Sequence, residues 1–445
     1  MGAVRDLSAR LGQERVLASG PELEAAAQVW NAAVRHRPAL VVRPRSAAEV
    51  AVAVEVAREH GLPLSVRAGG HDWLGRAVRD GGLVVDLTGM RRVTVDAAAQ
   101  VATVEGGATV GDVIGAAAPH GLVAAAGTVG GVGMAGLTLG GGYGPLAGRF
   151  GLAADNLLGA EVVLADGRVV TAEPDLLWAL RGGGGNFGVV TAMRVRLHPV
   201  ARLVVGTAAY AWEEAPRVLS RLREHLVGAP DELTVPSGVS CVLGPAVFLV
   251  PIWCGDEAAG HAAVTEVLGL GTPRQPTVEA MTYPELLARF EAYAAGGRHQ
   301  AMRTRSVPAH TPEVIDALVA AGESHTTPLS GVVVHHFHGA AARVPEEATA
   351  FGNRRDHLMV EIGAVWEPAP GDPAQPHHAW ADAVCSGLAP AALPGGYPNL
   401  LRPDDRDQIA HAYGGNAARL RAVKARYDPE HVFTATPLPL LRPNL

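Results

Sequence analysis

Three glycine-rich segments carry most of the residues with which this chain could bind a ligand. They cover residues 67–71, 127–144 and 182–188. Glycine lets the backbone pass close to a flat or anionic ligand, and successive backbone N–H groups can form a concavity that binds anions. A glycine-rich turn without a ligand is an equal alternative for any one segment, but three segments in one part of the chain favour ligand binding.

The pattern G-x-G-x-x-G occurs in two of these segments, at residues 131–136 and 183–188. In a Rossmann fold this pattern follows a strand directly and opens a helix. Residues 140–142 are three successive glycines, and each glycine inside a helix costs about 1 kcal/mol. The sequence therefore predicts a glycine-lined loop over residues 127–144 rather than a Rossmann nucleotide fold.

The first glycine-rich segment ends in a histidine that could do chemistry. It reads Arg67-Ala68-Gly69-Gly70-His71 and follows a predicted strand at residues 64–66. Such a turn groups several backbone N–H donors. A lone histidine in this place is more often a hydrogen-bonded turn residue, but the later glycine-rich segments favour a role for His71 in ligand binding.

A second group of histidines lies in the middle of the chain, at His335, His336 and His338. In a strand, His336 and His338 share one face, opposite His335. Two histidines on one face could bind a metal, but no carboxylate or cysteine completes a ligand set nearby. We therefore expect no metal site, and we expect these histidines to line a substrate pocket.

The predicted strands and helices that must position these residues follow a different pattern before and after residue 204. Before it, many short strands alternate with a few helices, and Ser46 with Glu49 forms a capping-box pattern at the start of one helix. After it, strand-like runs alternate with longer helical stretches, which predicts an antiparallel sheet with helices on one face. Residues 403–427 are predicted as one last amphipathic helix, stopped by Pro429.

Size and composition exclude several kinds of partner. The 445 residues exceed one hydrophobic core, so we expect two lobes, and the net charge of −7 predicts no nucleic-acid partner. The three scattered cysteines, Cys241, Cys254 and Cys385, suggest neither a zinc site nor a disulfide framework. No apolar run approaches the ~20 residues of a membrane span, so we expect no membrane partner and a cytoplasmic protein.

The glycine-rich segments and several other motifs follow one another in a characteristic order. They are 67–71, 127–144, Asp155-Asn156, 178–190, Ala348-Thr349-Ala350-Phe351 with Arg354 and Trp366, Tyr397-Pro398-Asn399, 413–416 and 419–429. In this order they resemble the berberine-bridge-enzyme-like branch of the vanillyl-alcohol-oxidase superfamily, the PCMH-type flavoproteins. The resemblance spans roughly residues 35–440.

The resemblance implies an α+β fold of two lobes. Residues 1–200, completed by the berberine-bridge-like segment 401–445, would form the FAD-binding domain. Residues 201–400 would form the substrate-binding domain, an antiparallel sheet backed by helices. Both implications agree with the change of character near residue 204.

The same resemblance implies that a ring nitrogen of His71 is bonded to the methyl carbon at position 8 of the flavin. Such a bond prevents loss of the cofactor and makes the flavin a stronger oxidant. The residues implied to contact FAD are Arg67, Ala68, Gly69, Gly70, His71, Gly127, Thr128, Val129, Gly130, Gly133, Met134, Gly136, Leu137, Gly141, Tyr143, Gly144, Asp155, Asn156, Gly188 and Val190. Val190 has core packing as its alternative role.

The sequence departs from the family's pattern at three places. Val129 stands where many relatives carry a cysteine that forms a second flavin bond, so we expect a single tether through His71. Met134 stands where relatives carry Val, Ile or Leu and where side-chain size affects oxygen access, which weakens the expectation of O2 as electron acceptor. After Phe433, residues 434–437 lack the two amides that many relatives place near the flavin.

Tyr397 is the predicted catalytic base, because it matches the family's Tyr-x-Asn segment, which in many members lies over the flavin. The alternative is a tyrosine that packs in a loop beside Pro394 and Pro398. Free phenols ionise near pH ~10, so a nearby donor or cation would be needed to ease ionisation.

We expect an FAD-linked oxidase of a small-molecule biosynthetic intermediate in bacterial secondary metabolism. A hydride would pass to flavin N5, and O2 would re-oxidise the flavin and give H2O2. The main alternative is a covalent flavoprotein that catalyses a cyclisation or rearrangement without net oxidation. A binding protein that has lost its flavin is a third hypothesis, and a homodimer is left open.

Overall fold

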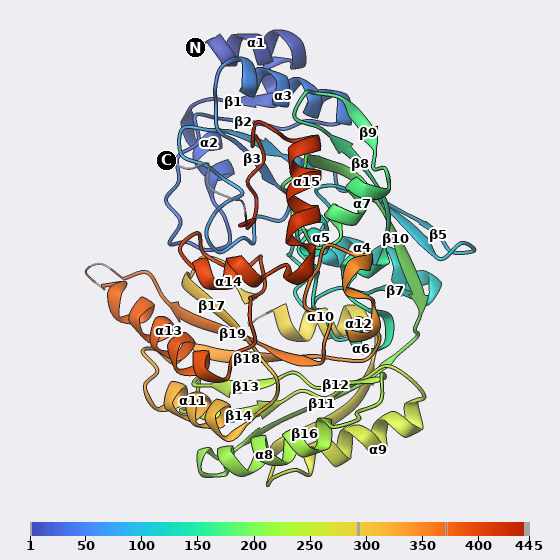
Figure 1. Ribbon diagram of the computed structural model, residues 1–445, viewed down its shortest axis with the longest axis vertical. Coiled ribbons are helices and arrows are strands. Elements are labelled where there is room, and N and C mark those ends of the chain that lie inside the picture. The colour runs from blue at the N-terminus through green and yellow to red at the C-terminus, as the bar shows by residue number, and fades with distance from the viewer. Residues whose placement is uncertain (1, 292–293, 370, 372, 440–445) are drawn as a thin grey trace.

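The computed structural model describes residues 2–291, 294–369, 371 and 373–439. Within these residues the strands form three sheets. In Figure 1 the two sheets built from the first 199 residues lie in the upper half, and the large third sheet lies in the lower half. The fold is α+β, as the sequence predicts. No helix in the described part of the chain is long and apolar enough to cross a membrane.

The first sheet positions the loop that carries His71. Its order is β1-β2-β4-β3, with β2 and β3 both parallel to β4. Its strands are β1 (Val16–Leu17), β2 (Leu40–Val42), β3 (Leu64–Arg67) and β4 (Leu83–Asp86). Helix α3 (Ala47–Glu59) connects β2 to β3, and the Ser46 side chain accepts a hydrogen bond from the Glu49 backbone N–H. The predicted capping box is only half formed, because the Glu49 carboxylate accepts from the Arg45 backbone N–H rather than from that of Ser46.

The second sheet is antiparallel and is organised around its longest strand, β10. This strand pairs with β6, β7 and β8, while β5 and β9 extend the sheet on either side. Its strands are β5 (Val93–Asp96), β6 (Val101–Glu105), β7 (Leu122–Ala124), β8 (Leu157–Val163), β9 (Val169–Thr171) and β10 (Val189–Pro199). The loop after β7 carries the second glycine-rich segment.

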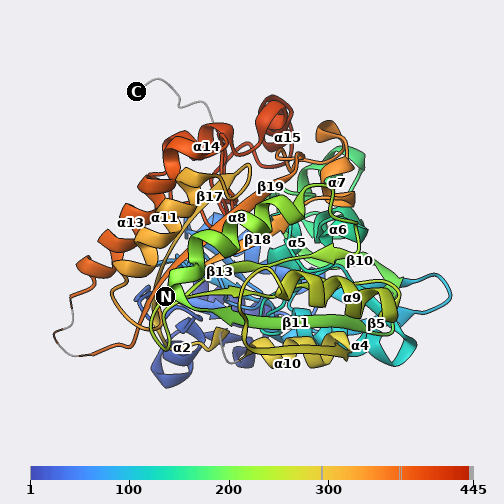
Figure 2. The same ribbon diagram turned by 90° about the horizontal axis from the view of Figure 1, so that it is seen from below.

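The third sheet is antiparallel, with the order β12-β15-β11-β14-β13-β18-β19-β17 and with β16 beside β11. Its strands are β11 (Leu203–Tyr210), β12 (Leu233–Thr234), β13 (Ser237–Ser240), β14 (Ala246–Leu249), β15 (Ile252–Trp253), β16 (Arg274–Met281), β17 (His299–Val307), β18 (Gly331–Phe337) and β19 (His357–Trp366). Figure 2 shows α11 (Pro312–Glu323) and α13 (Gln375–Leu388) side by side along it.

One face of the third sheet is apolar and the other carries polar side chains. Val334 and Val360 pack in one core cluster with residues of α8 (Ala215–Leu226), α11 and α13. Since successive side chains of a strand alternate between faces, His335 and Glu361 lie on the opposite face. That opposite face is turned toward the second glycine-rich segment, because His335 lies beside Tyr143.

The remaining helices precede, separate or follow these strands along the chain. They are α1 (Gly2–Leu11), α2 (Gly20–Ala27), α4 (Val110–Ala117), α5 (Met134–Leu139), α6 (Ala147–Phe150), α7 (Pro174–Leu180), α9 (Glu257–Leu268), α10 (Tyr283–Glu291), α12 (Ala340–Arg343), α14 (Arg406–His411) and α15 (Ala417–Tyr427). Helix α15 packs against α7, where Arg419 binds Asp175 and lies over the Trp178 ring at 4.1 Å.

Two expectations about helices are wrong. The segment 127–144 is not loop throughout, because α5 forms within it and ends where Gly140, Gly141 and Gly142 begin. Residues 403–427 are not one helix, because the chain breaks between α14 and α15 at Gly414, whose φ is +50°. The next backbone N–H, that of Gly415, is bound by the Glu346 carboxylate at 2.9 Å, which holds the break in place.

Candidate functional site

The first two glycine-rich segments fit together through bare backbone. A Cβ atom on Gly69 would lie 2.3 Å from the backbone nitrogen of Gly133, and one on Gly133 would lie 2.5 Å from that of Gly69. Gly70 has a φ of +69°, in the left-handed region that glycine adopts without strain. The glycines at these positions therefore let two loops from different sheets meet beside His71.

His71 lies between an aromatic ring and a glycine. Its imidazole stacks on Trp30, with ring centroids 5.3 Å apart and planes inclined by 21°. A Cβ atom on Gly131 would lie 2.9 Å from Nε2 of His71, so only glycine leaves room for the ring here. Burial lowers the pKa of His71 to about 4. At neutral pH the imidazole is therefore uncharged, with one nitrogen lone pair free to act as a nucleophile.

Arg67 supplies positive charge at the same turn. One of its terminal nitrogens, Nη1, donates to the carbonyl oxygen of Ala26 at 2.5 Å. Its buried Nε finds no hydrogen-bond partner within the described residues. A buried charged donor without a partner is costly unless a ligand satisfies it. Together with the glycine contacts and the neutral His71, this donor fits a flat, anionic cofactor.

Tyr397 lies against the end of the second glycine-rich segment. Its hydroxyl oxygen accepts hydrogen bonds from the Gly142 backbone N–H at 3.3 Å and from the Asn399 side-chain amide at 3.1 Å. Its ring meets that of Tyr143 edge to face, with centroids 5.1 Å apart. The structure thus brings two residues predicted for the site, Tyr397 and Tyr143, into contact.

Burial raises the pKa of Tyr397 to about 12, and the negative charge of Glu361 acts in the same direction. The two hydrogen bonds from Gly142 and Asn399 lower it but do not outweigh burial. Both donors point at the oxygen that would carry the charge of a phenolate. Tyr397 is therefore protonated at neutral pH, with two donors in place to stabilise its anion once a proton leaves.

Tyr143 connects the glycine-rich segment to the third sheet. Its hydroxyl group and Nε2 of His357 are 2.8 Å apart, and Nδ1 of His357 is 2.7 Å from the carbonyl oxygen of Arg355. Burial lowers the pKa of His357 to about 4 and raises that of Tyr143 well above its ordinary value. Both groups are therefore neutral and form a fixed wall of the site.

Three further polar groups face this wall from the third sheet. Nε2 of His335 lies 3.5 Å from a carboxylate oxygen of Glu361. Thr304 pairs with Glu361 in the strand register, and its buried hydroxyl has no hydrogen-bond partner in the described chain. The ring of His335 is 6.2 Å from that of Tyr143. Tyrosine, histidine, carboxylate and hydroxyl groups thus converge at one place.

Neither Glu361 nor His357 is singled out by a sequence motif. The signal that could have found Glu361 is its place in strand β19, where Val360 and Ile362 face the apolar core and Glu361 faces the other way. His357 contributes through its contact with Tyr143, which depends on the packing of distant segments.

Of His335, His336 and His338, only His335 has its ring beside that of Tyr143. His336 and His338 stack on each other instead, with centroids 3.8 Å apart and planes 6° apart, away from His335. We expected all three histidines to line a substrate pocket, but only His335 lies at the candidate site. No cluster of three or more His, Cys, Asp or Glu side chains suited to a metal occurs among the described residues.

The residues predicted to approach the adenosine half of FAD have partners within the protein. The Asp155 carboxylate binds Arg354 at 2.6 and 2.9 Å and also accepts from the Leu152 backbone N–H. Asn156 donates to two backbone carbonyls, and its side-chain oxygen lies 2.7 Å from Nε2 of His198. These bonds give both residues a structural role, and their contact with FAD stays a prediction.

The other predicted residues fall into two groups by burial. Met134 and Val190 are buried in the largest core cluster, and Gly70, Gly133, Gly141 and Gly188 are also buried. Half-buried or exposed positions, which a ligand can reach, are Arg67, Ala68, Gly69, His71, Gly127, Thr128, Val129, Gly130, Gly136, Leu137 and Gly144. The second group surrounds His71 and α5.

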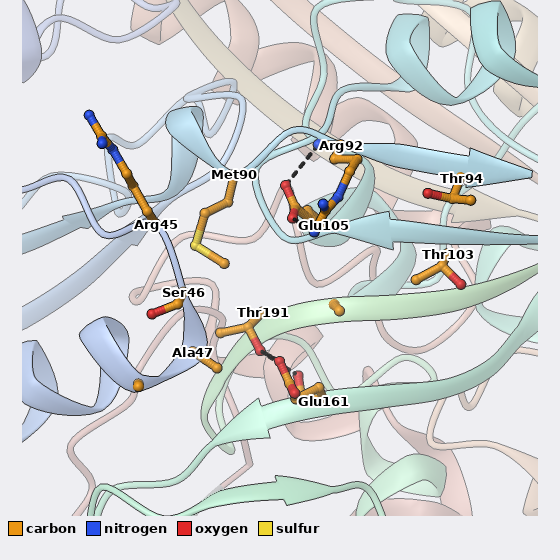
Figure 3. A pocket seen from close by; sticks show the side chains of 12 residues that line it. Arg45, Ser46, Ala47, Met90, Arg92, Thr94, Thr103, Glu105, Glu161 and Thr191 are labelled. Atoms are coloured by element: carbon orange, nitrogen blue, oxygen red, sulfur yellow. Dashed lines mark hydrogen bonds and ion pairs between the residues drawn. The ribbon is translucent and has the colours of Figure 1, made fainter.

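An open groove of about 460 Å³ lies elsewhere, between the start of α3 and strands β6, β8 and β10 (Figure 3). Both carboxylates that line it are engaged within the protein: Arg92 binds Glu105 at 3.0 Å, and Thr191 donates to Glu161 at 2.6 Å. It shares no lining residue with the three glycine-rich segments. The groove therefore lies apart from the candidate site.

Two family models match the chain. One, described as an FAD binding domain, covers residues 38–173. The other, described as berberine and berberine like, covers residues 396–437. The matched regions include all of the first two glycine-rich segments and Tyr397.

Curated relatives match nearly the whole chain. The FAD-linked oxidoreductase aurO of Gibberella zeae is 33% identical, and the alignment covers 93% of this chain and 83% of that protein. The (R)-6-hydroxynicotine oxidase of Paenarthrobacter nicotinovorans is 32% identical, with coverage of 92% and 93%.

Solved structures show the same fold. The 6-hydroxy-D-nicotine oxidase from Arthrobacter nicotinovorans superposes with a TM-score of 0.84 and 28% identity, over 95% of this chain and 96% of that chain. A berberine-bridge-like enzyme from Physcomitrella patens has a TM-score of 0.87 over 98% of each chain. At 23% identity, this similarity shows only that the two chains share a fold.

Proposed function

Because the chain belongs to the berberine-bridge-enzyme-like family of FAD-linked oxidoreductases, we propose that it oxidises a small organic molecule with an FAD held by one bond to His71. The observation that carries the proposal is the neutral imidazole of His71, enclosed beside Gly131 in a glycine-lined turn. The proposed substrate bears an oxidisable C–H next to an O–H or N–H group, such as an alcohol, an amine or a biosynthetic intermediate.

The residues proposed to hold FAD surround His71 and the second glycine-rich segment. Arg67 would place its unpartnered Nε against the diphosphate. The backbone of Gly69, Gly70 and Gly133 would let that group approach closely. When bound, FAD would accept a hydride from the substrate and pass the electrons to O2.

Tyr397 is the proposed proton acceptor for the substrate's O–H or N–H group. The Gly142 N–H and the Asn399 amide hold its oxygen in place and would stabilise the phenolate that forms when its proton leaves. Tyr143, fixed by His357, would close one side of the site. Glu361 and His335 would bind polar groups of the substrate from the third sheet.

A single tether is proposed because Val129 offers no nucleophile for a second bond. Cys241, Cys254 and Cys385 are buried and lie outside the proposed FAD-binding domain, residues 1–200 with 401–445.

Residues 201–400 would bind the substrate. This division is supported by the strands, since those up to Pro199 belong to the first two sheets and those from Leu203 onward to the third.

The proposed activity is tested by screening small alcohols, amines and polyketide- or alkaloid-like intermediates for anaerobic bleaching of the purified yellow protein. The product mass then identifies the reaction. Loss of two hydrogens supports oxidation, whereas an unchanged mass supports a rearrangement. A purified protein that is colourless and binds no FAD would refute the proposal.

A further inference from the structure

Trp30 lies outside the glycine-rich segments and before the matched FAD-binding region, yet it contacts His71 directly. Its ring stacks on the imidazole with centroids 5.3 Å apart, an offset arrangement that aromatic pairs favour. Its backbone N–H donates to the carbonyl oxygen of Gly70 at 3.0 Å, and its indole N–H donates to that of Ala294 at 2.8 Å. Ring and backbone of Trp30 are therefore both held.

Trp30 belongs to a strap, residues 26–33, that joins the His71 loop to the third sheet. Asn31 is buried, and its amide donates to the carbonyl oxygens of Trp73 at 2.6 Å and Gln300 at 2.9 Å. Its own side-chain oxygen accepts from the Gln300 backbone N–H at 2.9 Å. Since Gln300 lies in β17, the strap fixes Trp30 relative to both proposed domains.

We propose that Trp30 is a positioning residue for the attachment of FAD to His71. The indole covers one face of the imidazole, while Nε2 is directed at the bare backbone of Gly131. Tilting the imidazole out of its present plane would break the stacking and move Nε2 away from Gly131. Trp30 has no reactive group of its own, and it acts by holding the nucleophilic nitrogen of His71 in one orientation.

This inference rests on the proposed tether, which forms by a two-electron oxidation. A ring nitrogen of His71 replaces one hydrogen on the 8-methyl carbon of FAD. Two protons and two electrons are removed in total, from that C–H bond and the imidazole N–H bond. O2 accepts them and becomes H2O2. The step needs no oxidant beyond the O2 proposed for turnover.

The test compares four variants for the rate at which the chain gains the mass of FAD during incubation with FAD in air. Trp30→Leu and Trp30→Met remove the aromatic ring, whereas Trp30→Phe keeps a smaller aromatic ring and removes the N–H bond to Ala294. The matched control is Trp73→Leu, because Trp73 is buried two residues after His71 and its indole donates to Leu400 instead. Unfolding temperature and non-covalent FAD binding are measured on the same samples.

Loss of the ring should slow attachment by about 10- to 100-fold, as expected when a reacting group is misplaced. Trp30→Phe and Trp73→Leu should attach FAD at nearly the wild-type rate. The inference is overturned if Trp30→Leu and Trp30→Met load at the wild-type rate, whatever their stability, or if Trp30→Phe is as slow as they are. A wild-type chain that never gains the mass of FAD would instead refute the tether itself.

Discussion

At the scale of single residues, Tyr397 carries the proposed proton transfer, and its environment makes a pH-dependent prediction. Because burial raises its pKa to about 12, the phenolate fraction grows throughout the range from pH 7 to 10. The rate of anaerobic flavin reduction should therefore rise with pH over that range in the wild type.

Removing the phenol should remove this dependence. Tyr397→Phe should lower kcat/KM by about 10²- to 10⁴-fold, the usual contribution of a general base, and should give a flat pH profile. Tyr143→Phe is the matched control, because the Tyr143 ring contacts that of Tyr397 while its hydroxyl pairs with His357, so its loss should cost much less. A Tyr397→Phe variant that keeps both the rate and the slope would assign the base elsewhere.

Glu361 is the residue proposed to bind a polar group of the substrate. Glu361→Gln keeps the shape and removes the charge, so kcat/KM should fall by about 10- to 100-fold, as expected for a hydrogen bond to a charged group. The loss should appear mainly in KM. Glu367→Gln is the control, because Glu367 lies just past β19 and binds Arg298 on the surface. Equal effects of the two variants would contradict the assignment.

At the scale of elements, regular patterns could be predicted from the sequence and exceptions could not. The N-cap at Ser46 and the change from short strands to longer helices near residue 204 depend on local residue order, so they could be predicted. Helix α5 could not, because it buries Met134 and Leu139 in a core formed with distant strands. The break at Gly414 depends on Glu346, which lies far away in the chain.

The residues of the candidate site likewise divide into those that the sequence could predict and those that it could not. Arg67, His71, Tyr143 and Tyr397 belong to recognisable motifs. Glu361 comes near Tyr397 only through the packing of the third sheet against the glycine-rich segment, and Trp30 comes near His71 through the strap. Such contacts depend on sheet register and tertiary packing, which spacing in one sequence does not determine.

The C-terminal helix α15 is anchored by a buried ion pair. Lys424 binds Asp428 at 2.5 Å and the carbonyl oxygens of Asn186 and Phe433 at 2.6 Å. Lys424→Met would leave Asp428 buried and uncompensated, so the free energy of unfolding should fall by about 3–5 kcal/mol. Chemical denaturation measures this loss.

The double variant Lys424→Met/Asp428→Asn serves as the control. It removes both charges, so it should be more stable than the single variant. A single variant as stable as the wild type would show that the pair does not anchor α15.

At the scale of the whole molecule, buried neutral histidines should make the fold sensitive to acid. Burial lowers the pKa of His310 and of His357 to about 4, against an ordinary value of 6.5. Between these values the unfolded chain binds more protons than the folded one. Stability should therefore be greatest above pH 6.5 and should fall as the pH drops, by up to about 1.4 kcal/mol per pH unit for each such histidine.

Thermal unfolding at pH 7, 6 and 5 tests this expectation. His310→Phe should reduce the slope, because both ring nitrogens of His310 are buried without hydrogen-bond partners in the described chain. An unfolding temperature that does not change between pH 7 and 5 would contradict it.

The most direct test of the central claim is peptide mapping of the acid-denatured wild-type protein by mass spectrometry. The mass of FAD should remain on the peptide that contains His71, and none should be found on a peptide containing Cys241, Cys254 or Cys385. His71→Ala should still bind FAD through the glycine-rich segments but should release all of it in acid. Free FAD from the wild type, or a flavin on any cysteine peptide, would contradict the claim.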